Sequence, residues 1–299
     1  MLTGLATAVS PVTIELPSGL AGTPSGELFG FASGFADGSP FGQLVQVDPV
    51  SGDSTNIGSD NGLRSTAFDI TADHRGFILP FDADFETQQL HVLDLSTGTA
   101  TSIGSATAIG DAIDLARGTP LGSAEPYVLS LGSVGPMLYG VDTDTDSLVS
   151  IDSTTGAVGV VGTIGAVGMA NGGGYSGFSA LTGVDEDLDG EFDALFGSVN
   201  QFLGDNGAQR LGGIARLHLT TGEWSLVGTN PEIVFYGFGG TPAPTGCDPA
   251  DFDCNGAVDS NDLTVILAAW GTCAGCAADL DGDGFVDFED LMILLASWS

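Results

Sequence analysis

The chain has 299 residues and a net charge of −34 at pH 7, because 39 acidic residues face only five arginines and no lysine. This charge repels nucleic acids and anionic membrane surfaces, which excludes a nucleic-acid-binding function. A hydrophobic content of 42% is enough for a core, and 47 glycines indicate a turn-rich, mainly β fold.

The first residues lack the basic stretch and the long apolar stretch of a complete signal peptide, although Ala6-Thr7-Ala8 resembles a cleavage site. No segment is long and apolar enough to span a bilayer. We expect a secreted or cell-surface protein whose signal peptide is incomplete or absent. This expectation depends mainly on the C-terminal region described below.

A motif with a fixed internal spacing recurs four times between residues 40 and 230. Each copy has an apolar stretch, a turn rich in Asp, Ser or Thr that ends in Gly, and a second stretch that ends in another Gly at a constant interval. This pattern is typical of a β-hairpin, because Gly supplies the positive φ that the turn needs. The paired glycines are Gly52 and Gly58, Gly98 and Gly104, Gly156 and Gly162, and Gly222 and Gly228.

A short apolar strand precedes each hairpin, and a further segment, such as residues 67–70, provides a fourth strand. Four strands in each repeat, at the uneven intervals that these glycines mark, predict the blades of a β-propeller. The copies resemble the blades of secreted bacterial β-propellers, which implies the fold and says little about activity. We expect four or five blades, with a degenerate blade near residues 105–135 and residues 12–16 or 234–237 closing the ring. A β-sandwich of hairpins is the alternative.

Four acidic residues of the fourth repeat also have the spacing of a calcium loop: Asp185, Asp187, Asp189 and Asp193. Gly190 follows the third of them, but Phe196 stands where the last acidic ligand is expected. The segment is therefore either a structural Ca²⁺ loop that takes a ligand from elsewhere or an acidic hairpin insertion.

A Thr/Pro-rich segment, residues 241–246, predicts a short stiff linker. We expect a β-propeller-like domain over residues 1–240 and a small α-helical domain over residues 247–299. The small domain holds eleven acidic residues and no basic residue, so we expect metal binding to be coupled to its folding.

The small domain contains one calcium-loop pattern twice, first from Asp251 to Asp262 and again from Asp279 to Asp290. The pattern supplies oxygen ligands at positions 1, 3, 5, 7, 9 and 12, with a backbone carbonyl at position 7. Gly256 and Gly284 lie where each loop turns sharply, and Val258 and Val286 should pair the loops and face a shared core. The predicted ligands are Asp251, Asp253, Asn255, Ala257, Asp259 and Asp262, and Asp279, Asp281, Asp283, Phe285, Asp287 and Asp290.

A short apolar helix is predicted after each loop, over residues 263–270 and 291–298, and no helical segment precedes either loop. Together with Asp rather than Glu at position 12, the tandem loops resemble a dockerin domain over residues 247–299. The resemblance implies two bound Ca²⁺ ions and docking onto a cohesin module of a scaffold or cell-surface protein. Positions 10 and 11, which commonly face the cohesin, are Ser260-Asn261 in one copy and Phe288-Glu289 in the other, so the copies differ.

All four cysteines lie in the small domain, which favours two disulfides and an oxidising compartment. Cys247 and Cys276 hold similar places just before the two loops, which favours Cys247–Cys276 together with Cys254–Cys273. The alternative is a four-thiolate zinc site, since Cys273 and Cys276 have ligand spacing.

No nucleophile elbow, zinc-binding helix or phosphate loop occurs, so we predict no catalytic residue. We favour a non-catalytic β-propeller for recognition or scaffolding, joined to a cohesin-type or cell-surface partner by the calcium domain. One alternative is a hydrolase or lyase acting on extracellular polysaccharide, since dockerins often accompany such enzymes. The other is a purely structural surface protein in which calcium serves as a staple.

Overall fold

The computed structural model describes residues 17–23, 26–36, 39–49, 51–81, 87–105, 108–122, 128–142, 145–164, 175–186, 192–203, 209–231, 248–252, 257–273 and 276–298. The chain separates into two compact units, Met1–Pro242 and Ala243–Ser299. None of the helices in the described part of the chain is long and apolar enough to cross a membrane.

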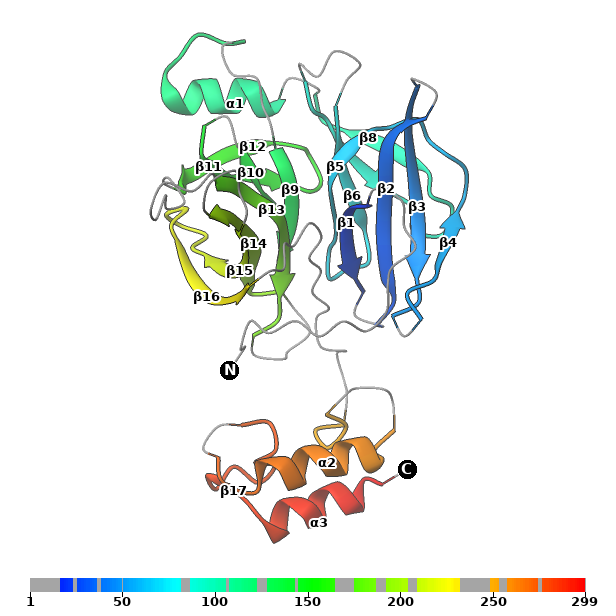
Figure 1. Cartoon of the computed structure of the whole chain (residues 1–299), viewed down its shortest axis with the longest axis vertical. Coiled ribbons are helices and arrows are strands. Elements are labelled where there is room, and N and C mark those ends of the chain that lie inside the picture. The colour runs from blue at the N-terminus through cyan, green and yellow to red at the C-terminus, as the bar shows by residue number, and fades with distance from the viewer. Residues whose placement is uncertain are drawn as a thin grey trace. The chain divides into compact units, whose positions relative to one another are not determined.

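The first unit contains four antiparallel sheets, each of four strands that pair in chain order (Figure 1). The first sheet has β1 (Pro17–Gly22), β2 (Leu28–Ala36), β3 (Ser39–Val47) and β4 (Ser54–Ile57). The second has β5 (Ser65–Ile70), β6 (Gly76–Pro80), β7 (Leu90–Leu93) and β8 (Ala100–Ile103). The third has β9 (Val128–Val134), β10 (Met137–Asp142), β11 (Ser147–Asp152) and β12 (Val158–Thr163). The fourth has β13 (Tyr175–Val184), β14 (Ala194–Leu203), β15 (Gln209–Leu217) and β16 (Trp224–Pro231).

The sheets meet through their first strands, since β1 contacts β5, β5 contacts β9, and β9 contacts β13. A separate apolar core fills each space between successive sheets: Phe31 and Phe68 join the first two, Phe77 and Leu138 the next two, and Leu148 and Leu181 the last two. This arrangement is a four-bladed β-propeller, in which each sheet is a blade and its first strand lies innermost.

The predicted hairpins are the outer strand pairs of the four blades. All four turns contain a glycine with positive φ, such as Gly98 at 71°. In the first three an Asp side chain also closes the turn, as where Asp94 Oδ1 accepts from the Ser96 amide at 2.8 Å, whereas the fourth has His218 at this position. The second glycine of the motif is needed for a different reason, which is the lack of space for a side chain. A Cβ atom on Gly58, Gly104 or Gly162 would lie 1.9, 2.8 or 2.1 Å from a carbonyl oxygen in the turn of the next blade. The second glycine of the motif therefore allows close backbone contact between neighbouring blades.

The predicted extra blade near residues 105–135 is wrong. The region holds the helix α1 (Ala108–Arg117) and then β9, the first strand of the third blade. Helix α1 packs on β12, and Ile109 and Ile113 are buried in the core between the second and third blades. The β-sandwich alternative is also wrong, because the four sheets pack through their first strands rather than as two facing layers. Residues 12–16 and 234–237 lie outside the described residues.

The second unit contains the helices α2 (Ser260–Ala269) and α3 (Phe288–Ala296), which contact each other. Both predicted helices are confirmed, and each begins earlier than predicted, at Ser260 and at Phe288. The cause is a capping box at each start, in which the Asp259 and Asp262 side chains of α2, and Asp287 and Asp290 of α3, exchange hydrogen bonds with backbone amides.

Val258 and Val286 are both buried in one core with Ile266 and Leu294, as predicted. Their predicted pairing across the loops stays a prediction. In the described residues, β18 (Phe285–Val286) pairs with β17 (Gly271–Thr272), and Val286 lies opposite Gly271. The chain leaves α2 in an extended conformation at Trp270, with ψ at 124°, and so continues directly into β17.

Cys273 and Cys276 form a disulfide with each other, with their Cα atoms 5.6 Å apart. The Cys276 amide donates to the Cys273 carbonyl at 3.1 Å, so a tight turn brings the two residues together. The favoured pairing of each with a more distant cysteine is therefore wrong. A four-thiolate zinc site is excluded as well, because an oxidised pair supplies no thiolate. Cys247 and Cys254 lie outside the described residues.

Candidate metal centre

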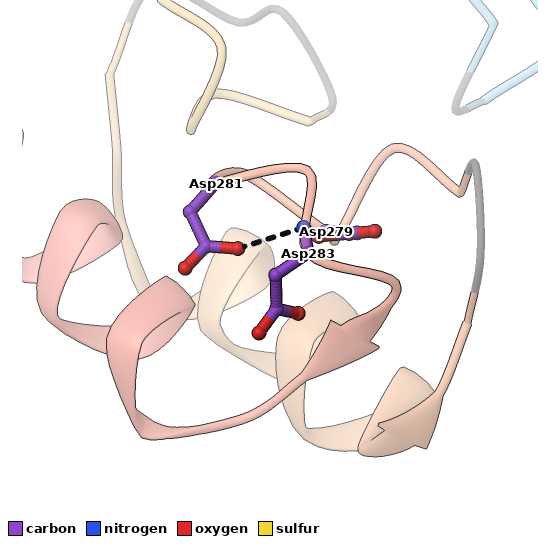
Figure 2. Close-up of side chains that lie close together, drawn as sticks. All are labelled: Asp279, Asp281 and Asp283. Carbon is purple, nitrogen blue, oxygen red and sulfur yellow. Dashed lines mark hydrogen bonds between the residues drawn. The ribbon is translucent and has the colours of Figure 1, made fainter.

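Three carboxylates of the second loop converge on one point. The closest carboxylate oxygens of Asp279, Asp281 and Asp283 all lie within 4.8 Å of one another. Figure 2 shows the three side chains on the segment that leads into α3. Oxygen atoms at this spacing can hold one metal ion, and an all-oxygen donor set suits a hard divalent cation.

The loop backbone holds these carboxylates in place. Asp279 accepts from the amides of Asp283 and Gly284 at 3.0 and 2.9 Å, and Asp281 accepts from the Asp283 amide at 3.1 Å. Gly284, with φ of 92°, and Gly282, with φ of 77°, adopt the left-handed conformation that glycine favours. The sharp turn predicted at Gly284 is present.

Asp290, at position 12 of the second loop, is fully buried and closes it. Its Oδ1 accepts from the Leu280 amide at 2.7 Å and its Oδ2 from the Asp287 amide at 2.8 Å. Burial raises the pKa of this carboxyl, but the hydrogen bonds from the Asp287, Leu280 and Asp281 amides outweigh it, so the pKa is lower than usual. Asp290 therefore stays ionised beside the acidic cluster.

The first loop repeats this closure. Asp262 is fully buried, and its carboxylate accepts from the Phe252 amide at 2.6 Å and from the Asp259 amide at 2.8 Å. Asp251 is also buried, whereas the predicted ligands Asp253 and Asn255 lie outside the described residues. The closing carboxylate of each loop thus makes the same two kinds of backbone contact at the entry to a capped helix.

Negative charge is concentrated at the second loop. At Asp281 a hydrogen bond from the Asp283 amide lowers the pKa, but desolvation and the charges of Asp283, Asp290 and Asp279 together raise it above its usual value. Glu289 also has a raised pKa, first because of its side-chain hydrogen bond with Asp287. Bound divalent cations would relieve this repulsion.

The predicted loop of the fourth blade is described only at its two ends. Asp185 is buried just after the end of β13, and Asp193 precedes β14, where its carboxylate accepts from the Glu186 amide at 3.0 Å. Glu186 forms an ion pair with Arg216. The remaining two acids, Asp187 and Asp189, lie outside the described residues, so a metal site here stays a prediction.

Asp69 is a buried ionisable residue that sequence reasoning treated only as part of a strand. It lies on β5, one of the innermost strands, and its Oδ2 makes no hydrogen bond within the described residues. Burial raises its pKa to about 7, although hydrogen bonds from Ser133 and Ile70 oppose the shift. The signal in the sequence is a single charged residue inside the apolar stretch at residues 67–70.

No family model and no curated protein matches the chain. Two solved structures similar to it are the extracellular domain of a hybrid two-component system from B. thetaiotaomicron and a protein described as a 6-phosphogluconolactonase from Bacteroides uniformis. The first is 10% identical with a TM-score of 0.35, and the match covers 72% of this chain and only 22% of that one. The second is 16% identical with a TM-score of 0.36, and the match covers 78% of this chain and 77% of that one.

Proposed function

We propose that the chain is an exported, non-catalytic protein of two modules. The β-propeller serves as a recognition or scaffolding domain, and the second unit is a dockerin-like module that binds two Ca²⁺ ions and attaches the propeller to a cohesin-type or cell-surface partner. The observation that carries this proposal is the convergence of Asp279, Asp281 and Asp283 in a loop whose pattern also occurs from Asp251 to Asp262. A duplicated all-oxygen loop before a capped helix is the arrangement expected of a calcium module.

Calorimetric titration of the full chain, stripped of metal, tests the calcium part of the proposal. We expect two Ca²⁺ ions to bind in the second unit, with affinities between about 10⁻⁷ and 10⁻⁴ M. The double variant Asp281→Asn, Asp283→Asn should lose one of them. Any binding that the pair Asp185→Asn, Asp193→Asn removes would report the predicted site of the fourth blade. The absence of calcium binding to the intact chain would overturn the proposal.

We assign docking to an apolar stripe along α3, which consists of Phe288, Leu291, Met292, Leu295 and Trp298. Phe288, Met292, Leu295 and Trp298 are 61, 50, 46 and 45% exposed. The spacing places the first four residues of the stripe on one side of α3, and Trp298 lies just beyond the end of the helix. On α2 the corresponding stripe is interrupted, because Ser260 and Thr264 stand where α3 has Phe288 and Met292. An exposed stripe of this kind favours insertion into a partner's apolar groove.

The charge of the second unit indicates the chemistry of the partner's binding site. The second unit has eleven acidic residues and no basic one, so a complementary site has an apolar floor and a basic rim. The like charge of a second copy opposes self-association. We therefore commit to a cohesin-type partner of that chemistry.

Interferometry between the calcium-loaded full chain and purified cohesin modules tests the docking face. Replacement of Phe288 by Ser and Met292 by Thr gives α3 the residues of α2 and should weaken binding at least about tenfold, since exposed aromatic anchors dominate such interfaces. Leu267→Ser on α2 is the matched control and should change binding little. Absence of binding to every module, or an equal loss in the α2 control, would overturn docking through α3.

A further inference from the structure

The second blade carries a cavity of about 490 Å³ that neither metal loop uses. It lies between the turn that joins β5 to β6 and the hairpin of β7 and β8. Its polar lining comes from His74, Arg75, Asp94, Thr97, Thr99 and Thr101, and Val92 and Leu95 add apolar surface. The volume falls within the usual range for small-molecule sites.

The β5–β6 turn has a counterpart in the first blade, the β1–β2 turn, and a comparison of the two shows which residues differ. Both turns have the same backbone hydrogen bond: the His74 amide donates to the Thr71 carbonyl at 2.9 Å, and the Gly26 amide donates to the Thr23 carbonyl at 2.9 Å. The left-handed position is Gly26 in the first blade, with φ of 80°, and His74 in the second, with φ of 63°. A histidine is held where glycine would be unstrained, and such strain is typical of binding sites.

Arg75 is fixed at the edge of the cavity. Its Nε donates to Asp73 at 2.8 Å, one Nη donates to Ser153 of the third blade at 3.0 Å, and its guanidinium lies 5.1 Å from the centre of the Phe77 ring. Within the described residues its other Nη makes no hydrogen bond. Each Nη carries two N–H groups, so Arg75 keeps donors on both Nη atoms for a ligand. The corresponding residue of the first blade is Glu27, so the positive group belongs to this blade.

The remaining lining suits a hydroxylated ligand. Three threonine hydroxyls lie along the β7–β8 hairpin, and Asp94 uses its Oδ1 to accept from Ser96 and Thr97, which leaves Oδ2 without a partner within the described residues. Val92 and Leu95 offer an apolar surface for the carbon face of a ring. Since Asp73 already offsets much of the charge of Arg75, a singly charged carboxylate fits better than a doubly charged phosphate.

We propose that this cavity binds an acidic sugar, a hexuronic acid residue of a polysaccharide. Its carboxylate pairs with Arg75 and His74, and its ring hydroxyls bond to Thr97, Thr99, Thr101 and Asp94. The proposal names a ligand class for the recognition role proposed above and rests on that role for its biological purpose. The binding itself depends on the second blade alone.

Ligand-observed NMR and calorimetry on the full chain with calcium test the site, with glucuronate and galacturonate as probes and glucose and inorganic phosphate as comparisons. We expect saturable binding of at least one uronate with a Kd near about 1 mM and at least about tenfold weaker binding of glucose. Arg75→Gln should weaken uronate binding about tenfold or more, because it removes the charge-assisted pair. Arg216→Gln, which breaks the exposed pair of Arg216 with Glu186 on the fourth blade, is the matched control and should leave binding unchanged.

His74→Gly restores the residue of the first blade and relieves the strained backbone, so it keeps the protein folded while it removes the imidazole. We expect weaker uronate binding with unchanged or higher thermal stability. Absence of uronate binding, equal binding of glucose, tighter binding of phosphate, or full binding in Arg75→Gln would each overturn the proposal. A chain that binds two Ca²⁺ ions but no uronate would overturn this site alone, whereas uronate binding without calcium binding would overturn only the calcium module.

Discussion

Asp69 couples the stability of the propeller to pH in an unusual direction. Its pKa rises from 3.8 to about 7 on folding, so between these values the folded state binds more protons than the unfolded state. Stability must therefore fall as the pH rises from about 4 to about 7. The shift of about three units corresponds to roughly 4 kcal/mol lost at pH 8 relative to pH 4.

We predict that Asp69→Asn, which keeps the shape and removes the charge, raises the free energy of unfolding at pH 8 and flattens its dependence on pH. Urea denaturation at constant calcium between pH 5 and pH 8, followed by the circular dichroism of the β-sheets, which belong almost entirely to the propeller, measures the difference from the wild type. Asp152→Asn is the control, and it should lower the stability by the same amount at every pH in this range. Hydrogen bonds from Thr154 and Thr155 lower the pKa of Asp152 to about 2, so its contribution is present above pH 4 and is lost on acidification. Parallel pH profiles for Asp69→Asn and wild type would contradict the assignment.

At the scale of the elements, the blades are joined by close backbone contacts at the repeated glycines. Gly58 and Gly62 have nearly the same φ, 69° and 68°, but a Cβ atom on Gly58 would lie 1.9 Å from the Thr97 carbonyl oxygen, whereas one on Gly62 would have nothing within 4 Å. We predict that Gly62→Ala costs about 1 kcal/mol, from backbone strain alone. Gly58→Ala should cost about 1–3 kcal/mol more, because the first and second blades must separate.

Thermal and urea unfolding of the two alanine variants measure this difference directly. Equal losses of stability would show that the motif glycine is needed only for its φ and that the contact between blades contributes little.

The elements differ in how far the sequence predicts them. The hairpins and the two capped helices were predictable because local rules specify them: Asp and Gly in a turn, and Asp at positions 9 and 12 of a loop. Helix α1 was missed because its stabilising contacts are distant in sequence, with Ile109 and Ile113 buried between two blades. The disulfide was mispredicted for the opposite reason, since a local turn joins Cys273 to Cys276 while the two-loop symmetry pointed to distant partners.

The two candidate sites also differ in how far the sequence predicts them. The spacing of Asp279, Asp281 and Asp283 on one short loop predicts their convergence, because neighbouring residues in a tight loop meet wherever the rest of the chain lies. The cavity beside Arg75 was not predictable in this way. It needs Ser153, which belongs to the third blade and is distant in sequence, to position the guanidinium.

At the scale of the whole molecule, the two compact units should respond differently to calcium. All predicted ligands of the two C-terminal calcium loops lie in the second unit, and two of the three tryptophans, Trp270 and Trp298, report on it. A ligand that binds only the folded state adds about 2.7 kcal/mol for each site at one hundred times its Kd. For a unit of this size, two such sites correspond to a rise in melting temperature of about 20 °C or more.

We therefore expect two unfolding transitions in calorimetry of the full chain and a large calcium-dependent shift in only one of them. That transition should be the one seen by tryptophan fluorescence, and Asp281→Asn with Asp283→Asn should reduce its shift by about half, since one loop remains. Calcium bound at residues 185–193 would instead move the propeller transition, so the same scan distinguishes the two locations. If chelation changes the melting temperature of neither transition, the second unit is stable without a metal despite its eleven acidic residues. The calcium-dependent attachment proposed above would then be wrong.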